Sequence, residues 1–192
     1  MANSLKTAQL KVEIAPSTQR CESSNSQVSA TVPDWSREQL HRWWEPSKQL
    51  LKSVRSYQKW RSKGGIFRLF LSKIAVLEHR FWTVASGAEV PLNAQIEGGL
   101  VLPHPNGVVI HPEAVIGPNC LIFQQVTLTR GVRLGGHVDI GAGAKIIRSV
   151  QIGDHAKVGA NAVVLGDVPP SATAVGIPAQ VILPDIQTDI QN

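Results

Sequence analysis

An aliphatic residue recurs at every sixth position in the second half of the chain: Ile110, Ile116, Ile122, Leu128, Leu134, Ile140, Ile146, Ile152, Val158 and Val164. Four residues after each of these comes a second, mostly small apolar residue: Ala114, Cys120, Val126, Val132, Val138, Ala144, Val150, Ala156, Ala162 and Val168. A period of six matches neither the helical period nor the alternation of an ordinary strand. It predicts a mainly β fold, a hexapeptide β-helix of short parallel strands in which both apolar sets point inward and stack in continuous columns.

The repeat is interrupted once. Val90, Ile96 and Leu102 keep the six-residue spacing in another phase, because the step from Leu102 to Ile110 is two residues too long. The two extra residues lie within 103–107, a segment that contains His104 between two prolines. Of the six histidines only His104 lies at the break. Because sites on rigid scaffolds are commonly built on local irregularities, we expect His104 to be functional.

A histidine that acts as a base needs a partner that orients its ring. Glu89 precedes His104 by close to one coil and is the best placed acid. Glu97 and Glu113 are the nearby alternatives. Each of the three is also compatible with an exposed corner carboxylate that has no role in a site.

Glycine directly follows five of the repeating aliphatic residues, at Gly117, Gly135, Gly141, Gly153 and Gly159. Glycine adopts left-handed backbone without strain. We therefore expect these five residues to form the corners that turn the chain from one strand to the next.

The chain has 192 residues and a net charge of +5, with the positive charge concentrated near the N-terminus. Residues 34–83 carry eleven Lys and Arg against four Asp and Glu. We interpret this excess as solvated helix faces, with an anionic membrane surface as the alternative. No nucleic-acid-binding motif accompanies it, so nucleic acid is not an expected partner.

No run approaches the ~20 apolar residues of a membrane span, and the first residues lack the apolar core of a signal peptide. The two cysteines, Cys21 and Cys120, have no metal-ligand spacing and are not expected to form a disulfide. These features predict a cytoplasmic protein without a metal.

We expect four segments along the chain. Residues 1–33 are polar and predict a mobile tail, 34–86 a helical region, 87–182 the β-helix and 183–192 a loose C-terminal tail. Within the helical region, Asp34 caps a short helix that runs to Trp44, and Pro46 opens a second helix that Gly64-Gly65 ends. A third helix has Ile66, Leu69, Phe70, Ile74, Leu77 and Phe81 on one side. All five tryptophans lie in this region, and we expect them to pack between the helices and the open end of the solenoid.

Several motifs resemble one known family. The run Gly99-Leu-Val-Leu-Pro-His-Pro-Asn-Gly107 is similar to the catalytic segment of serine O-acetyltransferases. Similar runs follow at 140–146, 157–165, 168–170 and 174–179, so the resemblance covers about half of the chain. It implies a left-handed β-helix with triangular coils, of which 90–169 would form about four and a half. It also implies a trimer that transfers the acetyl group of acetyl-CoA to L-serine, giving O-acetylserine for cysteine biosynthesis.

The resemblance assigns roles by position. His104 is the general base, and Glu89 is the orienting acid where the family usually has Asp. The pantetheine arm of acetyl-CoA is expected beside the small residues Ala142, Gly143 and Ala160. Cationic side chains are expected to contact its phosphates, and the candidates are Lys145, Arg148 and Lys157.

Three departures bear on the acceptor. Pro103 replaces the family's Asp before the histidine, and the Gly-rich loop with its Arg-His pair for the serine carboxylate is absent. Arg130 and Arg133 are the candidates to take over that carboxylate. The chain ends in Asn192 rather than in the Ile that docks cysteine synthase, so this docking is not expected. The helical cap is also shorter than the family's usual N-terminal domain, so a hexamer is not expected. Two alternatives remain open: a sugar-hydroxyl acetyltransferase of exopolysaccharide or lipopolysaccharide biosynthesis, and a non-catalytic trimeric scaffold.

Overall fold

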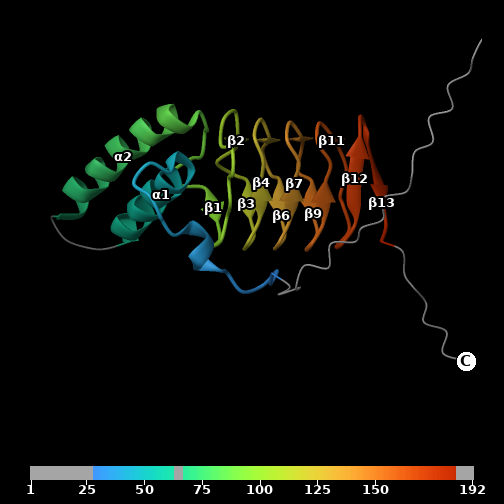
Figure 1. The fold of residues 1–192 in the computed structure, drawn as a ribbon, viewed down its shortest axis with the longest axis horizontal. Coiled ribbons are helices and arrows are strands. Elements are labelled where there is room, and N and C mark those ends of the chain that lie inside the picture. The colour runs from blue at the N-terminus through green and yellow to red at the C-terminus, as the bar shows by residue number, and fades with distance from the viewer. Residues whose placement is uncertain (1–27, 63–66, 185–192) are drawn as a thin grey trace, which may run out of the picture.

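The computed structural model describes residues 28–62 and 67–184. Two helices form an antiparallel pair at one end, and the coils of a β-helix follow one another along the long axis (Figure 1). The helices are α1 (Pro46–Ser62) and α2 (Phe67–Ser86), preceded by the 3₁₀ turn η1 (Trp35–Glu38). None of the described helices is long and apolar enough to cross a bilayer. The expected tail residues 1–27 and Gly64-Gly65 lie outside the described residues.

The β-helix has three faces. The first face stacks β1 (Gln95–Ile96), β3 (Val115–Ile116), β6 (Arg133–Leu134) and β9 (Gln151–Ile152). The second face stacks β2 (Val109–Ile110), β5 (Thr127–Leu128), β8 (Lys145–Ile146) and β11 (Val163–Val164). The third face stacks β4 (Leu121–Ile122), β7 (Asp139–Ile140), β10 (Lys157–Val158), β12 (Thr173–Gly176) and β13 (Ala179–Ile182). All pairs are parallel except β12–β13, so the parallel β-helix with a helical cap is confirmed.

The strand register shows where the chain is longer by two residues. Between the first two coils, Glu89 pairs with Val109 and Val101 pairs with Leu121. Between the next two coils Val109 pairs with Thr127. This step along the chain is two residues shorter than the step from Glu89 to Val109 and equals three hexads. The longer first step contains the segment 103–107, as the interruption of the repeat predicts.

The two inward columns form one continuous core. Every member of both apolar sets between Ile110 and Val168 is at most 3% exposed. The columns continue without a gap to Leu50, Leu51 and Trp82 of the helices. Fully burying an aliphatic side chain contributes about 1.5–3 kcal/mol, so this column is the main source of the fold's stability. The helical pair covers the open end of the first coil, as a solenoid requires.

The reason for the glycines is different from the one predicted. Left-handed backbone occurs two residues later in the hexad, at Asn119, Gln125, His137, His155 and Asn161 and at glycines of the same position such as Gly131 and Gly143. Gly117 and its counterparts do not have positive φ. Instead the coils approach each other closely there, and a Cβ on Gly117 would lie 2.5 Å from the carbonyl oxygen of Gly135. The expectation of left-handed backbone at these five glycines was therefore wrong.

The first element of the helical region is shorter than predicted, and the tryptophans of this region are only partly buried. Asp34 caps η1 by accepting a hydrogen bond from the Ser36 N–H (3.0 Å), but the turn ends at Glu38 and not at Trp44. The second helix begins at Pro46, as predicted. Of the five tryptophans only Trp82 belongs to the core, while Trp43 is 77% exposed. The prediction that all five pack in the core was therefore wrong.

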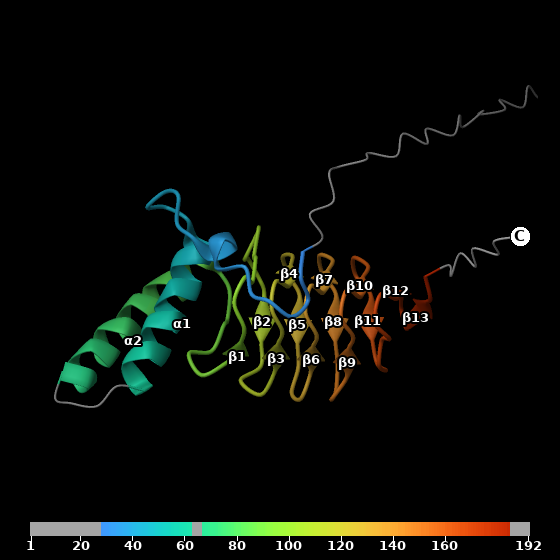
Figure 2. The ribbon, with the colours of Figure 1, turned by 90° about the horizontal axis from the view of Figure 1, so that it is seen from below.

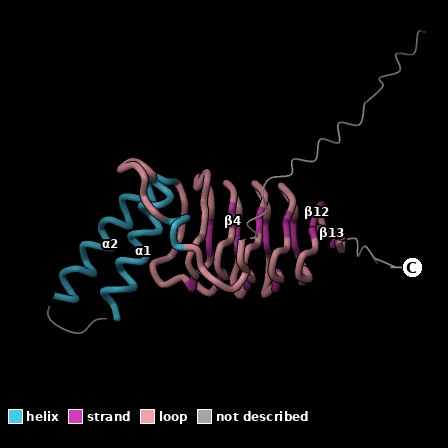
Figure 3. Tube along the Cα trace, turned by 60° about the horizontal axis from the view of Figure 1, so that its bottom comes forward, coloured by secondary structure: helices cyan, strands magenta, loops and turns pink. Residues whose placement is uncertain are grey.

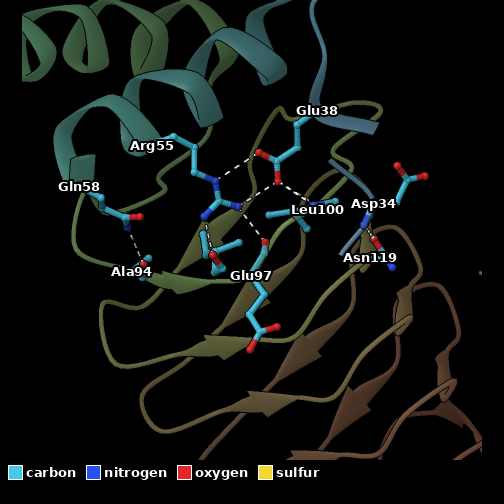
Figure 4. Close-up of polar contacts among 10 residues, drawn as sticks. Asp34, Glu38, Arg55, Gln58, Ala94, Glu97, Leu100 and Asn119 are labelled. Carbon is cyan, nitrogen blue, oxygen red and sulfur yellow. Dashed lines mark hydrogen bonds and ion pairs between the residues drawn. The ribbon is translucent and has the colours of Figure 1, made fainter. Parts of the chain in front are cut away.

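Arg55 of α1 ties the N-terminal region to the first coil (Figure 4). Its guanidinium pairs with Glu38 at 2.9 Å and donates to the carbonyl oxygens of Ile96 and Glu97. The Glu38 carboxylate in turn accepts the N–H of Gly99 at 2.9 Å. This ion pair therefore fixes the position of η1 and α1 on the β-helix.

Asn119 holds the segment that precedes η1. It is 1% exposed, and its side-chain amide donates to the carbonyl oxygens of Ser29 and Val32, both at 2.8 Å. Its amide oxygen accepts the N–H of Asp34 at 2.8 Å. The segment consequently runs beside the middle coils (Figure 2). The expected mobile tail over 1–33 thus differs from the structure for residues 28–33, which are bound to the β-helix.

Candidate active site

His104 lies at a corner of the β-helix, between the third and second faces. It is the third residue after Val101, which pairs with Leu121, and the same count on later coils gives Gln124, Ala142 and Ala160. Backbone hydrogen bonds from Gly143 N–H to Gln124 O (2.9 Å) and from Asn161 N–H to Ala142 O (2.8 Å) hold these corners on one another. We call this row, His104, Gln124, Ala142 and Ala160, the corner column. Figure 3 shows the loops that join the strands following one another along the long axis, coil after coil.

Hydrogen bonds fix the backbone that follows His104, although the His104 side chain itself is exposed. Gly107 has φ +70° and donates its N–H to the carbonyl oxygen of Gly87 at 2.7 Å. The Val108 N–H donates to Pro105 O at 3.1 Å, which closes the turn. His104 is therefore presented to solvent next to a turn whose backbone is fixed by hydrogen bonds.

Glu89 is close to His104 in the backbone but is not bonded to it. Its N–H donates to Val108 O at 2.8 Å and its carbonyl oxygen accepts the Ile110 N–H. No hydrogen bond or ion pair between Glu89 and His104 occurs among the described residues, and the Glu89 side chain is exposed in a different pocket, beside His79 and His111. The alternatives are no better placed, because Glu113 pairs with Arg130 at 2.9 Å and Glu97 lines a third pocket beside β1.

A pocket of about 580 Å³ opens beside His104. The helical region provides its other wall, with Glu45 and Lys48 at the start of α1 and Arg37 from η1. The pocket thus combines one carboxylate and two cations with the exposed imidazole. None of these three charged residues was predicted, because no repeat or motif marks them.

Glu45 is anionic. Its carboxylate accepts the N–H groups of His41 (2.8 Å) and Arg42 (3.2 Å), and Lys48 lies 3.4 Å away. These hydrogen bonds, first that from His41 and then that from Arg42, lower the pKa of Glu45 below its ordinary value. Lys48 also donates to Gln39 O at 2.7 Å, so both side chains are held where the loop meets α1.

Gln124 is a fourth residue that the sequence did not predict. Its side-chain Oε1 is buried and has no hydrogen-bond partner among the described residues. An unpaired buried acceptor costs about 1–3 kcal/mol. The available signal was its hexad position, which it shares with His104, Ala142 and Ala160.

The remaining predicted site residues are spread over the β-helix. Gly143 has φ +74° beside Ala142, and Lys145 of β8 donates to Gln125 O near the corner column. Lys157 lies on β10 with an exposed side chain, and Arg148 is also exposed. Arg130 and Arg133 are not among the described residues that line the His104 pocket: Arg130 pairs with Glu113, and Arg133 lies on β6 of the first face.

Cys120 cannot act as a nucleophile. It is buried in the core column, and burial raises the pKa of its thiol to about 12. A thiol that stays protonated is a poor nucleophile. No group of three or more potential metal ligands occurs among residues 28–62 and 67–184.

The stacked coils and their six-residue repeat define a hexapeptide-repeat β-helix protein. No protein-family model matches the chain. It is 42% identical over 105 residues to the serine acetyltransferase of Synechococcus elongatus, covering 50% of this chain and 43% of that protein. It is 37% identical over 141 residues to the serine acetyltransferase of Helicobacter pylori, covering 63% of this chain and 82% of that protein. The chain therefore belongs to the serine acetyltransferase family.

Solved structures give the same assignment. Soybean serine acetyltransferase complexed with serine superposes with a TM-score of 0.61 at 32% identity, covering 72% of this chain and 58% of that one. A serine acetyltransferase in complex with CoA gives the same score and identity, covering 72% and 57%. The chain spans less than half the length of the Synechococcus elongatus relative and of a rice relative.

Proposed function

We propose that this protein is an acetyl-CoA-dependent serine O-acetyltransferase. Membership of the family supports the reaction, and so do the relatives crystallised with serine and with CoA. The observation that carries the choice of acceptor is the pocket in which His104 faces Glu45, Lys48 and Arg37. A pocket with both charges suits a zwitterionic amino acid, whereas a neutral sugar hydroxyl needs neither.

The proposed reaction is a direct transfer. A ring nitrogen of His104 takes the proton of the serine hydroxyl while its oxygen attacks the thioester carbonyl. Backbone N–H groups at the corner stabilise the negative charge on the carbonyl oxygen of the tetrahedral intermediate. When the C–S bond breaks, the imidazolium returns the proton to the departing CoA sulfur. No acyl-enzyme is needed.

In this proposal Glu89 orients the imidazole. Its backbone lies next to the loop that follows His104, and its exposed side chain is free to turn toward the ring. The extra methylene of Glu relative to the family's Asp gives the reach for that turn. Glu89 is therefore a positioning residue, and the contact forms with substrate bound.

The acceptor is held by the helical region. The anionic Glu45 receives the serine ammonium group, and Arg37 and Lys48 receive its carboxylate. This replaces the Arg-His loop that the β-helix lacks. Arg130 and Arg133 lie away from this pocket within one chain, so they have a role only across the interface of the homotrimer that we propose.

The donor lies along the corner column. Ala142 and Ala160 leave room for the pantetheine arm to approach the backbone beside Gly143. The unpaired Gln124 Oε1 offers an acceptor to an amide N–H of that arm. We assign the cations Lys145, Arg148 and Lys157 to the phosphates, and of these Lys145 donates to Gln125 O near the corner column.

The test is CoA release, measured as free thiol, with L-serine and with a panel of nucleotide sugars and oligosaccharides. We expect turnover with L-serine only, and His104→Ala should abolish it. Turnover with a sugar and not with serine would establish the alternative acceptor. No release with any hydroxyl acceptor would refute the proposal and leave a non-catalytic scaffold.

A second measurement isolates the acceptor pocket. Loss of one charge-assisted contact to a ligand weakens binding by roughly 10- to 150-fold. Glu45→Gln should raise the KM for L-serine by about that factor and leave the KM for acetyl-CoA unchanged. Glu97→Gln makes the same substitution in the pocket beside β1, away from His104, and is the matched control. Equal effects of the two variants would count against Glu45 as the ammonium site.

A further inference from the structure

One side of α2 carries a row of large apolar side chains that nothing covers in the described structure. Its members are Phe70, Ile74, Leu77, Phe81 and Val84, with exposed fractions of 65, 48, 71, 57 and 85%. We call this row the α2 stripe. The opposite side of the helix packs inward through Ala75 and Trp82. The stripe therefore adds nothing to the fold of one chain, and exposed apolar patches of this kind mark contact surfaces.

The spacing of the stripe specifies the shape of its partner. Its members are separated by four, three, four and three residues, the alternation of the a and d positions of a coiled coil. Such a narrow seam packs best against another helix, because a and d side chains insert between four residues of a facing helix. A helix that lies flat on a bilayer usually presents a broader apolar face.

The flanking charges specify the direction. With Ile74 and Phe81 at a positions, Lys73 and Arg80 occupy g positions and Glu78 occupies an e position. In a parallel pair of identical helices, g faces the e position of the next heptad on the partner, so Lys73 of one copy faces Glu78 of the other. In an antiparallel pair centred on Leu77, Lys73 would face Arg80, and like charges repel.

We propose that α2 associates in parallel with α2 of neighbouring copies of this chain, through the α2 stripe and the Lys73–Glu78 contact between copies. Parallel packing of identical helices is what rotational symmetry about an axis along the helices produces. This contact extends the assembly beyond the β-helix. It does not depend on the catalytic proposal, because no residue of the stripe lines the His104 pocket.

Cysteine cross-linking tests the contact and its direction. Two cysteines form a disulfide when their Cα atoms lie within about 7 Å, which holds for equivalent d positions of parallel coiled-coil helices. In the full chain carrying Cys21→Ser, Val84→Cys should give a disulfide-linked pair after mild oxidation. Arg61→Cys, exposed on α1, is the control and should stay monomeric on the same gel. No cross-link with Val84→Cys would overturn the proposal, as would a cross-link that forms only in the Phe70→Cys/Val84→Cys double variant, which indicates antiparallel helices.

A charge swap separates this contact from a general apolar surface. Lys73→Glu in the Val84→Cys background should slow cross-linking, and adding Glu78→Lys should restore it, because the pair is then reversed. A double variant as slow as the single one contradicts the pairing. Sedimentation with vesicles of phosphatidylserine and phosphatidylcholine covers the membrane alternative. Vesicle binding that Leu77→Asp abolishes, in a protein that does not cross-link, would replace the second copy by a bilayer.

Discussion

Two glycine-to-alanine substitutions in the β-helix should change stability in opposite directions. Gly117 and Gly166 both lack positive φ, so alanine suits the backbone of each. At Gly117 the new methyl group would lie 2.5 Å from the carbonyl oxygen and 2.6 Å from the carbonyl carbon of Gly135. Ordinary contact begins at 3.4 Å, so the next coil would have to move by about 0.9 Å. Gly135 resists this movement because its own N–H is bonded to Ile152 O at 2.8 Å.

Overpacking of this kind typically costs about 1–3 kcal/mol, and a rigid backbone neighbour places Gly117→Ala at the upper end. For a chain of this size we expect Tm to fall by about 4–12 °C. At Gly166 nothing lies within 4 Å of the new methyl group. Gly166→Ala should therefore stabilise by about 0.4–1 kcal/mol, through the lower entropy of the unfolded chain. Urea unfolding followed by circular dichroism measures both variants. Similar shifts of the two midpoints would refute the role of close coil approach.

Three further predictions concern the site and the pH dependence. Ala160→Tyr should raise the KM for acetyl-CoA at least tenfold with little change in the KM for L-serine, because the tyrosine ring would fill the space proposed for the donor beside the backbone. Steady-state kinetics with each substrate varied in turn checks this prediction. An unchanged KM for acetyl-CoA would place the donor elsewhere. Gln124→Met should stabilise the free protein by up to about 1–3 kcal/mol in urea unfolding, since it removes an unpaired buried acceptor. The same substitution should lower kcat/KM for acetyl-CoA. A destabilised variant would contradict this prediction. Burial lowers the pKa of His79 and His137 below the ordinary 6.5, so the unfolded chain takes up these protons at higher pH than the folded one. The contribution of the two neutral histidines to stability is complete above pH 6.5 and is lost as the pH falls through their pKa values in the folded protein. The midpoint of urea unfolding should therefore be lower at pH 5.5 than at pH 7.5. A midpoint that does not change with pH would show that protonation of these histidines is not coupled to unfolding.

The repeat made the β-helix predictable because a buried column leaves its period in the sequence. It also located the interruption, since an extra residue pair shifts the phase of every later hexad. The close approach at Gly117 could not be anticipated in the same way, because the distance between coils is not a property of one hexad. Glycine suited two explanations, and only the backbone angles separate them.

The acceptor wall of the pocket left no trace in the sequence. Glu45 and Lys48 belong to a region without a repeat, and they reach His104 only because Arg55 and Asn119 fix that region on the coils. Periodicity likewise found the apolar side of α2 but not its exposure. Whether an amphipathic helix covers its own fold or a partner depends on the side that the neighbouring helix occupies.

The longer first step gives the corner column a fixed origin, and later positions follow at intervals of three hexads. Removing one whole coil, for example 145–162, would therefore leave the remaining strands in matching register and shorten the β-helix by the height of one coil. Removing a stretch that is not a multiple of a hexad would turn inward side chains outward from that point on. A protein family with this fold can lengthen or shorten its corner column by whole coils while its histidine stays at the same place. Length variation among such chains is thus expected to come in discrete steps rather than as scattered insertions.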